Sequence, residues 1–325
     1  TQISQSARVV FAWAMGITQH ANGVANVQAI VNLLLMGGHF GRPGAGACPV
    51  RGHSNVQGDR TVGVWEHTPP WMSRMEEAFS FTAPKETGYD VVGAIEAMVA
   101  GRTDVFFAMG GNFLSATPDT PAVAEGLRKT RITAHVATKL NRAHLVTGQT
   151  GLILPCLGRT ERDVQPSGSQ FVTVENSMGI VSRSEGKLKP ASEQLLSEPR
   201  IVARLAEATL GTHAKVSWSE LADDYDRIRD AIERCVPGFD DFNRRVREPD
   251  GFALPNPVRE GGFATPSGRG QFTTHELPEL DLAPGRYWLM TIRSHDQFNT
   301  TVYDLDDRYR GIHGHRHVVL MNSDD

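Results

Sequence analysis

The stretch from Gly16 to Gly58 constrains this sequence most, because an apolar helical pattern leads there into an unusually long glycine-rich loop. Apolar side chains recur near helical spacing between about Val24 and Met36, which predicts a helix. The loop that follows, 37–58, is longer than most connections in compact domains, and such loops are usually functional or disordered. Its glycines allow close approach of a ligand to the backbone, and it ends in polar side chains. We therefore interpret the loop as one wall of a ligand pocket.

Short apolar segments alternate with helical patterns through the first half of the chain, which predicts an α/β fold with a parallel sheet. Ligands of such sheets bind at the carboxyl ends of the strands. That rule places Gly110, Gly111, Asn112 and Thr138 at a candidate nucleotide site, because they follow two predicted strands. The expected strands are 8–15, 105–109, 130–136 and 152–155, and the expected helices are 24–36, 89–101, 121–129 (with Thr120 as its N-cap) and 140–147.

The second half of the chain has a different organisation. Residues 171–190 predict a hairpin, and helices are expected over 197–210 and 217–235. The segment 236–285 is rich in Pro, Gly and Arg and reads as a linker, and strands are expected at 287–293 and 317–321.

Bulk properties exclude several classes of protein. The 325 residues are 40% hydrophobic and 22% charged, as in soluble globular proteins, and the net charge of −4 indicates no nucleic-acid-binding surface. The three cysteines lie far apart with no metal spacing, so no metal ligand is predicted and a reducing compartment is favoured. No apolar run reaches the length of a membrane span, so no membrane insertion is expected.

Several short motifs at fixed spacing resemble the molybdopterin oxidoreductase superfamily, and within it a branch similar to formate dehydrogenase alpha subunits. The matching segments are Met15-Gly16-x-Thr18-Gln19-His20, Gly41-Arg42-Pro43-Gly44-x-Gly46, Pro49-Val50-Arg51-Gly52-x-x-Asn55-Val56-Gln57-Gly58, Met109 to Asn112, Val174-Glu175-Asn176-Ser177-x-Gly179 and Thr291 to Thr301. The resemblance covers most of the chain, although Thr138 stands where the superfamily usually has an aspartate.

The resemblance implies a domain plan. Residues 1–235 would form the molybdopterin oxidoreductase α/β region with Rossmann-like parallel sheets, of which 1–60 end one domain and 61–235 form a second. Residues 236–285 would be a linker, and 286–325 would start a dinucleotide-binding β-barrel domain. The sequence is expected to be a central fragment that is inactive alone.

The resemblance also implies a function: two-electron oxidation by a bis(molybdopterin guanine dinucleotide) molybdenum or tungsten enzyme in the cytoplasm, with formate to carbon dioxide as the leading reaction. It admits a [4Fe–4S] cluster and an electron-transfer subunit as a partner. The cluster cysteines and the residue that ligates molybdenum would lie upstream of this sequence.

Arg51 and His53 are the candidate catalytic residues. By resemblance Arg51 occupies the position of the arginine beside the molybdenum, where a guanidinium can hold a small carboxylate in a bidentate fork. His53 would be a hydrogen-bond donor or proton relay. The alternatives are an arginine that anchors the loop or a cofactor phosphate, and a structural histidine.

The resemblance assigns cofactor contacts to eleven residues: Met15, Gln19, Gly110, Gly111, Asn112, Thr138, Glu198, Arg293, His295, Gln297 and Thr300. Each has a structural alternative. Met15 could pack at a strand end, and the glycines could form an ordinary turn. Glu198 could serve only to favour a helix N-terminus.

Three other functions stay open at this stage. The enzyme could act on another small substrate, or the chain could belong to a catalytically silent scaffold or electron-transfer subunit of the same superfamily. A simple nucleotide-binding α/β protein is the third alternative, against which the turn from Met15 to His20 argues.

Overall fold

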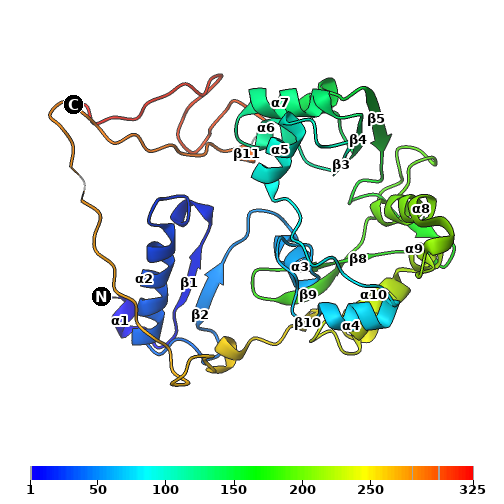
Figure 1. Ribbon diagram of the computed structural model, residues 1–325. Helices are drawn as coiled ribbons and strands as arrows, with labels where there is room; N and C mark the ends of the chain where they lie inside the picture. Colours follow the sequence, from blue (N-terminus) through cyan, green and yellow to red (C-terminus); the bar gives the residue numbers. More distant parts are fainter. Residues whose placement is uncertain (1, 280, 299–300, 325) are drawn as a thin grey trace. The chain divides into compact units, whose positions relative to one another are not determined.

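The computed structural model describes residues 2–279, 281–298 and 301–324, and its fold is mixed α/β with small parallel and antiparallel sheets (Figure 1). Two compact units each combine separate stretches of chain: 1–88 with 156–276 form the first, and 89–155 with 277–325 form the second. The domain boundaries expected from the sequence stay predictions.

A parallel sheet of order β3-β4-β5 organises the second unit. Helices α5 and α7 lie side by side against it, and a core of Met98, Leu114, Val123, Leu127 and Ala143 fills the interface (Figure 1). The prediction of a parallel sheet is confirmed here. The elements are α5 (Val91–Val99), β3 (Val105–Met109), α6 (Phe113–Ala116), α7 (Thr120–Lys129), β4 (Ile132–Ala137), η2 (Arg142–Leu145) and β5 (Thr150–Pro155).

Local side-chain bonds set where these helices begin. The Asp90 carboxylate accepts from the Gly93 amide at 2.7 Å and caps α5. Asp119, not the expected Thr120, caps α7, because its carboxylate accepts from the Ala122 amide at 3.1 Å. The helix expected over 140–147 is only the short 3-10 turn η2, held by a capping box between Asn141 and His144.

The start of the first unit is a parallel pair of strands followed by short helices. Strand β1 (Val10–Trp13) pairs with β2 (Gly46–Pro49), and α2 (Gly23–Met36) connects them. The 37–58 stretch is therefore not one irregular loop, because it contains β2. The almost continuous apolar run at 8–15 indicates a buried strand, but the residues of β1 alternate between exposed and half-buried. The other elements are α1 (Gln2–Gln5), η1 (Met15–Ile17), α3 (Val56–Thr61) and α4 (Met72–Phe79).

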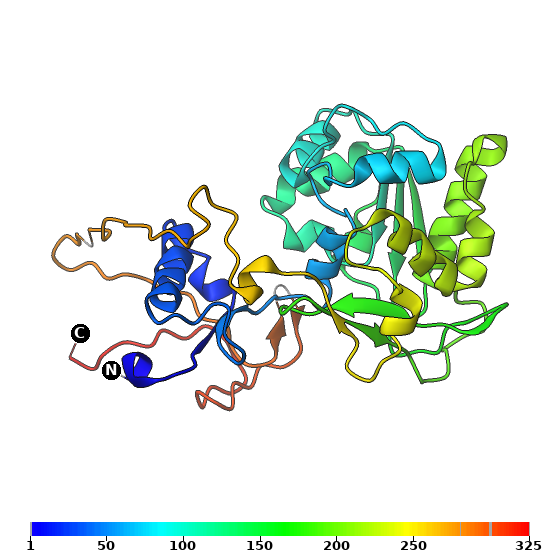
Figure 2. The same ribbon diagram turned by 90° about the horizontal axis from the view of Figure 1, so that it is seen from below.

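The rest of the first unit is an antiparallel sheet covered by helices. Its order is β10-β9-β8, and the hairpin predicted over 171–190 is confirmed by β8 (Val172–Glu175) and β9 (Ile180–Ser184), side by side in both views (Figure 1, Figure 2). The elements that accompany them are β6 (Val164–Gln165), β7 (Gly168–Ser169), α8 (Glu198–Leu210), η3 (Gly211–His213), α9 (Trp218–Asp223), α10 (Tyr225–Cys235), α11 (Phe242–Arg245), β10 (Phe252–Ala253) and η4 (Pro257–Glu260).

The helix expected over 217–235 is two helices, α9 and α10. The break falls at Asp224, whose extended backbone ends α9 and whose carboxylate accepts from the Asp226 amide at 3.1 Å, so that it caps α10. Burial of one face of α10 then fixes the direction of the new helix.

Aromatic side chains after α10 form the core of the first unit. Phe242 is completely buried, and its ring lies 4.7 Å from that of Phe239 and 5.6 Å from that of Phe252. Val181 of β9 and Val246 complete the cluster. Five residues within the segment expected as a linker thus belong to a packed core: Val236, Phe239, Phe242, Val246 and Phe252.

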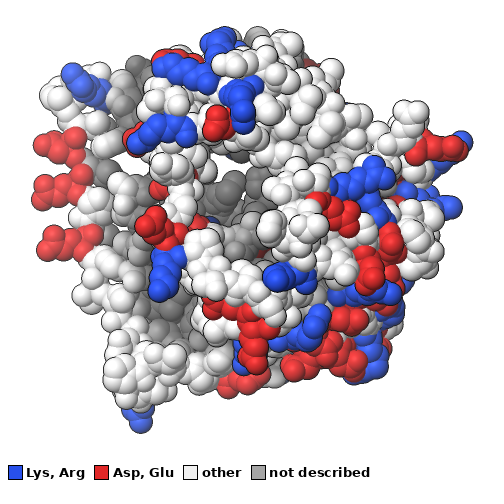
Figure 3. Space-filling view, turned by 45° about the vertical axis from the view of Figure 1, so that its right-hand side comes forward, with Lys and Arg blue, Asp and Glu red and all other residues white. Residues whose placement is uncertain are grey.

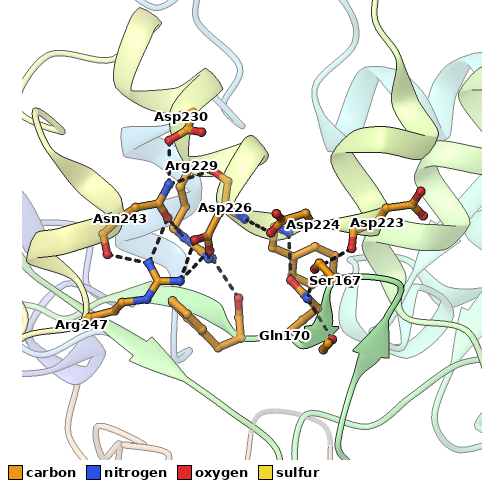
Figure 4. Close-up of polar contacts among 12 residues, drawn as sticks. Ser167, Gln170, Asp223, Asp224, Asp226, Arg229, Asp230, Asn243 and Arg247 are labelled. Atoms are coloured by element: carbon orange, nitrogen blue, oxygen red, sulfur yellow. Dashed lines mark hydrogen bonds and ion pairs between the residues drawn. The ribbon is translucent and has the colours of Figure 1, made fainter.

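A buried arginine joins α10 to the neighbouring loop and to α11 (Figure 4). The Arg229 guanidinium is 4% exposed, lies 3.9 Å from the Phe171 ring centroid and donates to Asn243 Oδ1 at 2.6 Å. It also pairs with Asp226, whose two carboxylate oxygens accept from Arg247 Nη2 at 2.8 and 2.7 Å. Burial alone would raise the pKa of Asp226, but hydrogen bonds from Arg247 and Arg229 lower it.

The C-terminal stretch of the second unit holds little regular structure in its described part. Strands β11 (Gln297–Phe298) and β12 (Thr301–Val302) pair, and a bridge joins Asp307 to Ile312. The strands expected at 287–293 and 317–321 are wrong, because neither segment has a ladder partner among the described residues. No barrel forms in the part of 286–325 that the structure describes.

Acidic and basic side chains are intermixed over the right-hand part of the face in Figure 3, as the small net charge of −4 leads one to expect. One exposed pair joins Arg227 to Glu220 at 2.9 Å. None of the helices in the described part of the chain combines the length and apolarity needed to cross a bilayer.

Candidate functional site

Two parallel strands of the first unit end side by side and deliver the predicted catalytic loop. Trp13 of β1 pairs with Pro49 of β2, and the Val50 amide donates to the Trp13 carbonyl at 2.7 Å. The chain then enters η1 on one side and the loop from Arg51 on the other. Met15 and Arg51 therefore share the carboxyl edge of one parallel pair, the place where ligands bind in α/β sheets.

Arg51 is exposed and oriented by its neighbours. Its Nε and Nη2 donate to Gln57 Oε1 at 3.2 and 3.0 Å, and its backbone amide donates to Ser177 Oγ at 3.0 Å. Among the described residues, its Nη1 has no hydrogen-bond partner. The arrangement holds the guanidinium plane from one edge and leaves the other edge for an anion.

At Gly52 the loop that contains Arg51 lies close to Met15 of η1. A Cβ at this position would lie 3.0 Å from both Sδ and Cε of Met15, so only glycine fits without moving that side chain. Met15 is 50% exposed, which contradicts simple core packing, and Gln19 is exposed on the following turn. Both predicted cofactor contacts are therefore available to a ligand.

His53 is also exposed, and the residues after it tie the loop to the antiparallel sheet. Ser54 Oγ accepts from Arg159 Nη1 at 2.9 Å. Asn55 Oδ1 accepts from the backbone amide of Glu175 at 2.9 Å, and Asn55 Nδ2 donates to Asp59 Oδ1 at 3.2 Å. These contacts fix the loop without engaging the imidazole.

Glu175 is the buried carboxyl of this site and was not among the predicted site residues. It ends β8, is 7% exposed, and its Oε2 has no hydrogen-bond partner among the described residues. Burial raises the pKa of Glu175, while polar contacts from Thr61 and Gln57 and the charge of Arg51 oppose that shift. An acidic residue at the end of the strand pattern Val-Thr-Val-Glu is the signal that could have revealed it.

The second unit holds the other predicted cluster. Gly110 and Gly111 follow β3 with φ of 69° and 75°, a backbone region that favours glycine, and a Cβ at either would meet no atom within 4 Å. Asn112 Oδ1 is buried and unpartnered among the described residues. Thr138 follows the neighbouring strand β4 and is exposed. The four residues thus share a carboxyl edge, as predicted from the sequence.

A pair of histidines supports this glycine turn. Asn141 Nδ2 donates to the Gly111 carbonyl at 2.8 Å, and the Asn141 amide donates to His144 Nδ1 at 2.9 Å. The His144 ring lies 5.0 Å from that of His135, and both are buried. Burial, and then the proximity of His144, lower the pKa of His135.

The predicted residues near the C-terminus are held by their own segment. His295 Nε2 contacts Arg308 Nη2 at 2.7 Å and its ring lies 4.7 Å from that of Tyr309, while Gln297 Oε1 accepts from Arg316. Arg293 is exposed. Thr300 lies outside the described residues.

Glu198 is exposed at the first residue of α8. Ser197, its neighbour, is the actual N-cap, because Ser197 Oγ accepts from the Arg200 amide at 3.4 Å. The position fits the helix-terminus alternative as well as a ligand contact, and its role stays a prediction.

Comparison with known proteins finds relatives along nearly the whole chain. "Uncharacterized oxidoreductase Rv2900c" of Mycobacterium tuberculosis is 52% identical over 98% of this chain and 41% of its own length. "Protein YdeP" of Escherichia coli is 48% identical over 97% of this chain and 42% of its own. "Putative formate dehydrogenase YrhE" of Bacillus subtilis is 34% identical over 30% of this chain and 11% of its own.

No protein-family model matches the chain. The chain spans about two fifths of the length of the first two relatives, 41% and 42%. It is homologous to these two proteins over almost all of its residues, and a shorter stretch is related to the putative formate dehydrogenase.

Proposed function

We propose that this chain is part of a molybdenum-dependent oxidoreductase that carries a bis(molybdopterin guanine dinucleotide) cofactor and oxidises a small carboxylate, with formate as the first candidate. The observation that carries the proposal is the exposed guanidinium of Arg51 at the shared carboxyl edge of β1 and β2, oriented by Gln57. The names of the relatives support the reaction class, and that of the shorter match supports formate.

The residues present suit such a cofactor. The ends of β1 and β2 present the exposed Met15 thioether and Gln19 amide. The second unit presents a glycine turn open to a ligand and the buried Asn112 Oδ1, which has no hydrogen-bond partner in the described part of the chain. Backbone amides in such turns suit phosphate or ribose, and an amide side chain can pair with the edge of a pterin.

The part of this chain in the reaction would be to bind and orient. Arg51 would hold the substrate carboxylate through the guanidinium edge that Gln57 leaves open. His53, exposed two residues later, would hold or pass a proton at its imidazole. When bound, the molybdenum cofactor supplies the two-electron acceptor, while the protein supplies position and charge.

The test is made on the full-length protein from a host that synthesises the cofactor. Metal analysis and the fluorescence of oxidised pterin report the cofactor, and formate-dependent dye reduction reports the reaction. Arg51→Ala removes the guanidinium, and Arg51→Lys keeps a charge without the fork. We expect metal and pterin in all three proteins and formate oxidation lost in Arg51→Ala and strongly reduced in Arg51→Lys.

The outcomes separate the alternatives. Metal and pterin without formate oxidation would keep the cofactor and move the search to another small substrate. A protein with neither metal nor pterin would leave a catalytically silent scaffold or electron-transfer subunit.

A further inference from the structure

Glu175 is a buried carboxyl that interacts with the exposed guanidinium of the candidate site. Glu175 is 7% exposed and its Oε2 has no partner among the described residues, although buried carboxylates normally have their oxygens hydrogen-bonded. Its backbone is fixed by the Asn55 side chain and by the β8–β9 ladder with Val181. The charge of the Glu175 carboxylate is thus only partly compensated.

Gln57 connects this carboxyl to Arg51. The Gln57 Oε1 accepts both hydrogen bonds from the Arg51 guanidinium, and Gln57 also acts on Glu175 as a polar contact that favours the charged form. The Arg51 backbone amide donates to Ser177 Oγ at 3.0 Å, two residues beyond Glu175, and the nearby Arg51 charge favours the Glu175 carboxylate. A group that neutralises the charge of Arg51 therefore favours the protonated form of Glu175.

We propose that the Arg51 site binds a small monocarboxylate anion together with a proton, which is held on the side chain of Glu175. This inference rests on the proposed function, since it assigns the charge state of the same site with substrate bound.

The physical reason is a loss of compensation when the anion arrives. The positive charge of Arg51 favours the Glu175 carboxylate before binding, whereas a bound anion cancels that charge and adds a second negative one nearby. Two negative charges near one guanidinium, one of them buried, cost more than one negative charge and a neutral acid. Protonation of Glu175 relieves this repulsion, so anion and proton bind cooperatively.

The other charged groups on the packed elements are few. Helix α3 carries Asp59 and Arg60, and β9 carries Arg183. Arg259 of η4 lies beside the β8–β9 turn, where a Cβ on Gly179 would be 3.4 Å from its Nη2 and 3.9 Å from Glu175 Oε1.

Two of these groups already have partners. The Arg259 guanidinium donates to the Met178 carbonyl, and the Asp59 carboxylate accepts from Asn55. These contacts leave the charges of Arg259 and Asp59 in place, and an anion at Arg51 does not change them. Arg51 is the charge near Glu175 that the anion would neutralise.

Calorimetric titration of acetate into the full-length holoenzyme tests the proposal. Acetate is a monocarboxylate without a hydrogen on its carboxyl carbon, so binding is measured without turnover. Titrations at one pH in two buffers of different ionisation enthalpy give the number of protons taken up with each anion. We expect the uptake of up to about one proton for each acetate bound. The dissociation constant of acetate should fall by up to about tenfold for each unit by which the pH is lowered.

Variants identify the group that takes the proton. Glu175→Gln mimics the neutral acid, so it should bind acetate with no proton uptake and with little dependence on pH. Glu185→Gln, an exposed carboxyl on the same hairpin, should keep the wild-type uptake. Arg51→Lys should weaken acetate binding both in the otherwise wild-type protein and in Glu175→Gln.

Three results would overturn the inference: acetate binding without proton uptake, uptake that persists in Glu175→Gln, or no acetate binding at any pH. The wild-type pH dependence tests it even if Glu175→Gln does not fold. Formate-dependent dye reduction decides the proposed function separately, so an active enzyme without linked proton uptake would lose only this inference.

Discussion

The side chain of Gln57 holds Arg51 by two hydrogen bonds to a single oxygen, at 3.2 Å from Nε and 3.0 Å from Nη2. Gln57 is the second residue of α3, so a residue of a helix, and not the loop alone, orients the Arg51 guanidinium. Gln57 holds one edge of the Arg51 guanidinium, so the other edge stays in a fixed plane. Less side-chain conformational entropy is therefore lost when a carboxylate binds to that edge.

Replacing Gln57 by alanine should therefore weaken substrate binding more than it slows the reaction. Loss of the Gln57 hydrogen bonds to the exposed Arg51 guanidinium costs about 1 kcal/mol, or roughly a fivefold rise in KM for formate. The value of kcat should change less. Steady-state dye reduction measures both, and Gln194→Ala, an exposed glutamine in the same unit, is the control. Equal KM values for Gln57→Ala and the wild type would show that Gln57 does not position Arg51.

The stability of the second unit should fall in mild acid because of His135. Burial lowers the pKa of the His135 imidazole in the folded state. Below about pH 6.5 the imidazole therefore binds a proton in the unfolded chain more readily than in the folded chain. The stability that comes from the neutral His135 imidazole is fully present above about pH 6.5 and is lost as the pH falls through the lowered pKa of the folded state. Urea unfolding between about pH 7.5 and 5 should show this slope in the wild type and less of it in His135→Phe. The exposed His213 gives a control variant, His213→Phe, which should keep the wild-type slope.

Local patterns in the sequence predicted much of the fold. Short apolar runs identified β3 and β5, the alternation of strands and helices placed β4 between them, and Pro121 and Ser197 marked where helices begin. The misplaced features depend on tertiary context. Nothing local shows that Asp224 breaks one amphipathic pattern into two helices, or that a segment rich in Pro and Gly supplies Phe242 to a core. The strands expected at 287–293 and 317–321 require neighbours that composition cannot reveal.

The site was predictable where it follows strands and not where it depends on contacts distant in sequence. Arg51 and Met15 follow β2 and β1, so the rule for parallel sheets brings them together. Glu175 reaches the same site from a hairpin 120 residues beyond Asn55, and no spacing rule predicts that approach. The sequence offers only an acidic residue at a strand end, and the burial of Glu175 in the structure marks it as part of the site.

Truncation of Phe242 should be among the most costly changes in the first unit. The side chain is 0% exposed and touches the rings of Phe239 and Phe252, so Phe242→Ala removes buried area and leaves a cavity worth about 3–5 kcal/mol. Phe272, which is 61% exposed, supplies the matched control, and Phe272→Ala should cost less than about 1 kcal/mol. Chemical unfolding of both variants measures the difference. Similar losses in the two would contradict the placement of Phe242 in the core.

Neutralising Glu175 should stabilise the protein at neutral pH while it alters the site. Because burial raises the pKa of Glu175 in the folded state, the folded chain keeps its proton to a higher pH than the unfolded chain does. The stability from this carboxyl is therefore complete below about pH 4.5 and is lost as the pH rises through the raised pKa. Glu175→Gln removes a buried charge that Thr61, Gln57 and Arg51 compensate only in part, and this change is worth about 1–3 kcal/mol at pH 7. Thermal unfolding at several pH values should show the variant gaining on the wild type as the pH rises, and Glu185→Gln should show no such gain. A variant that is less stable than the wild type throughout this range would mean that the Glu175 carboxylate is compensated after all.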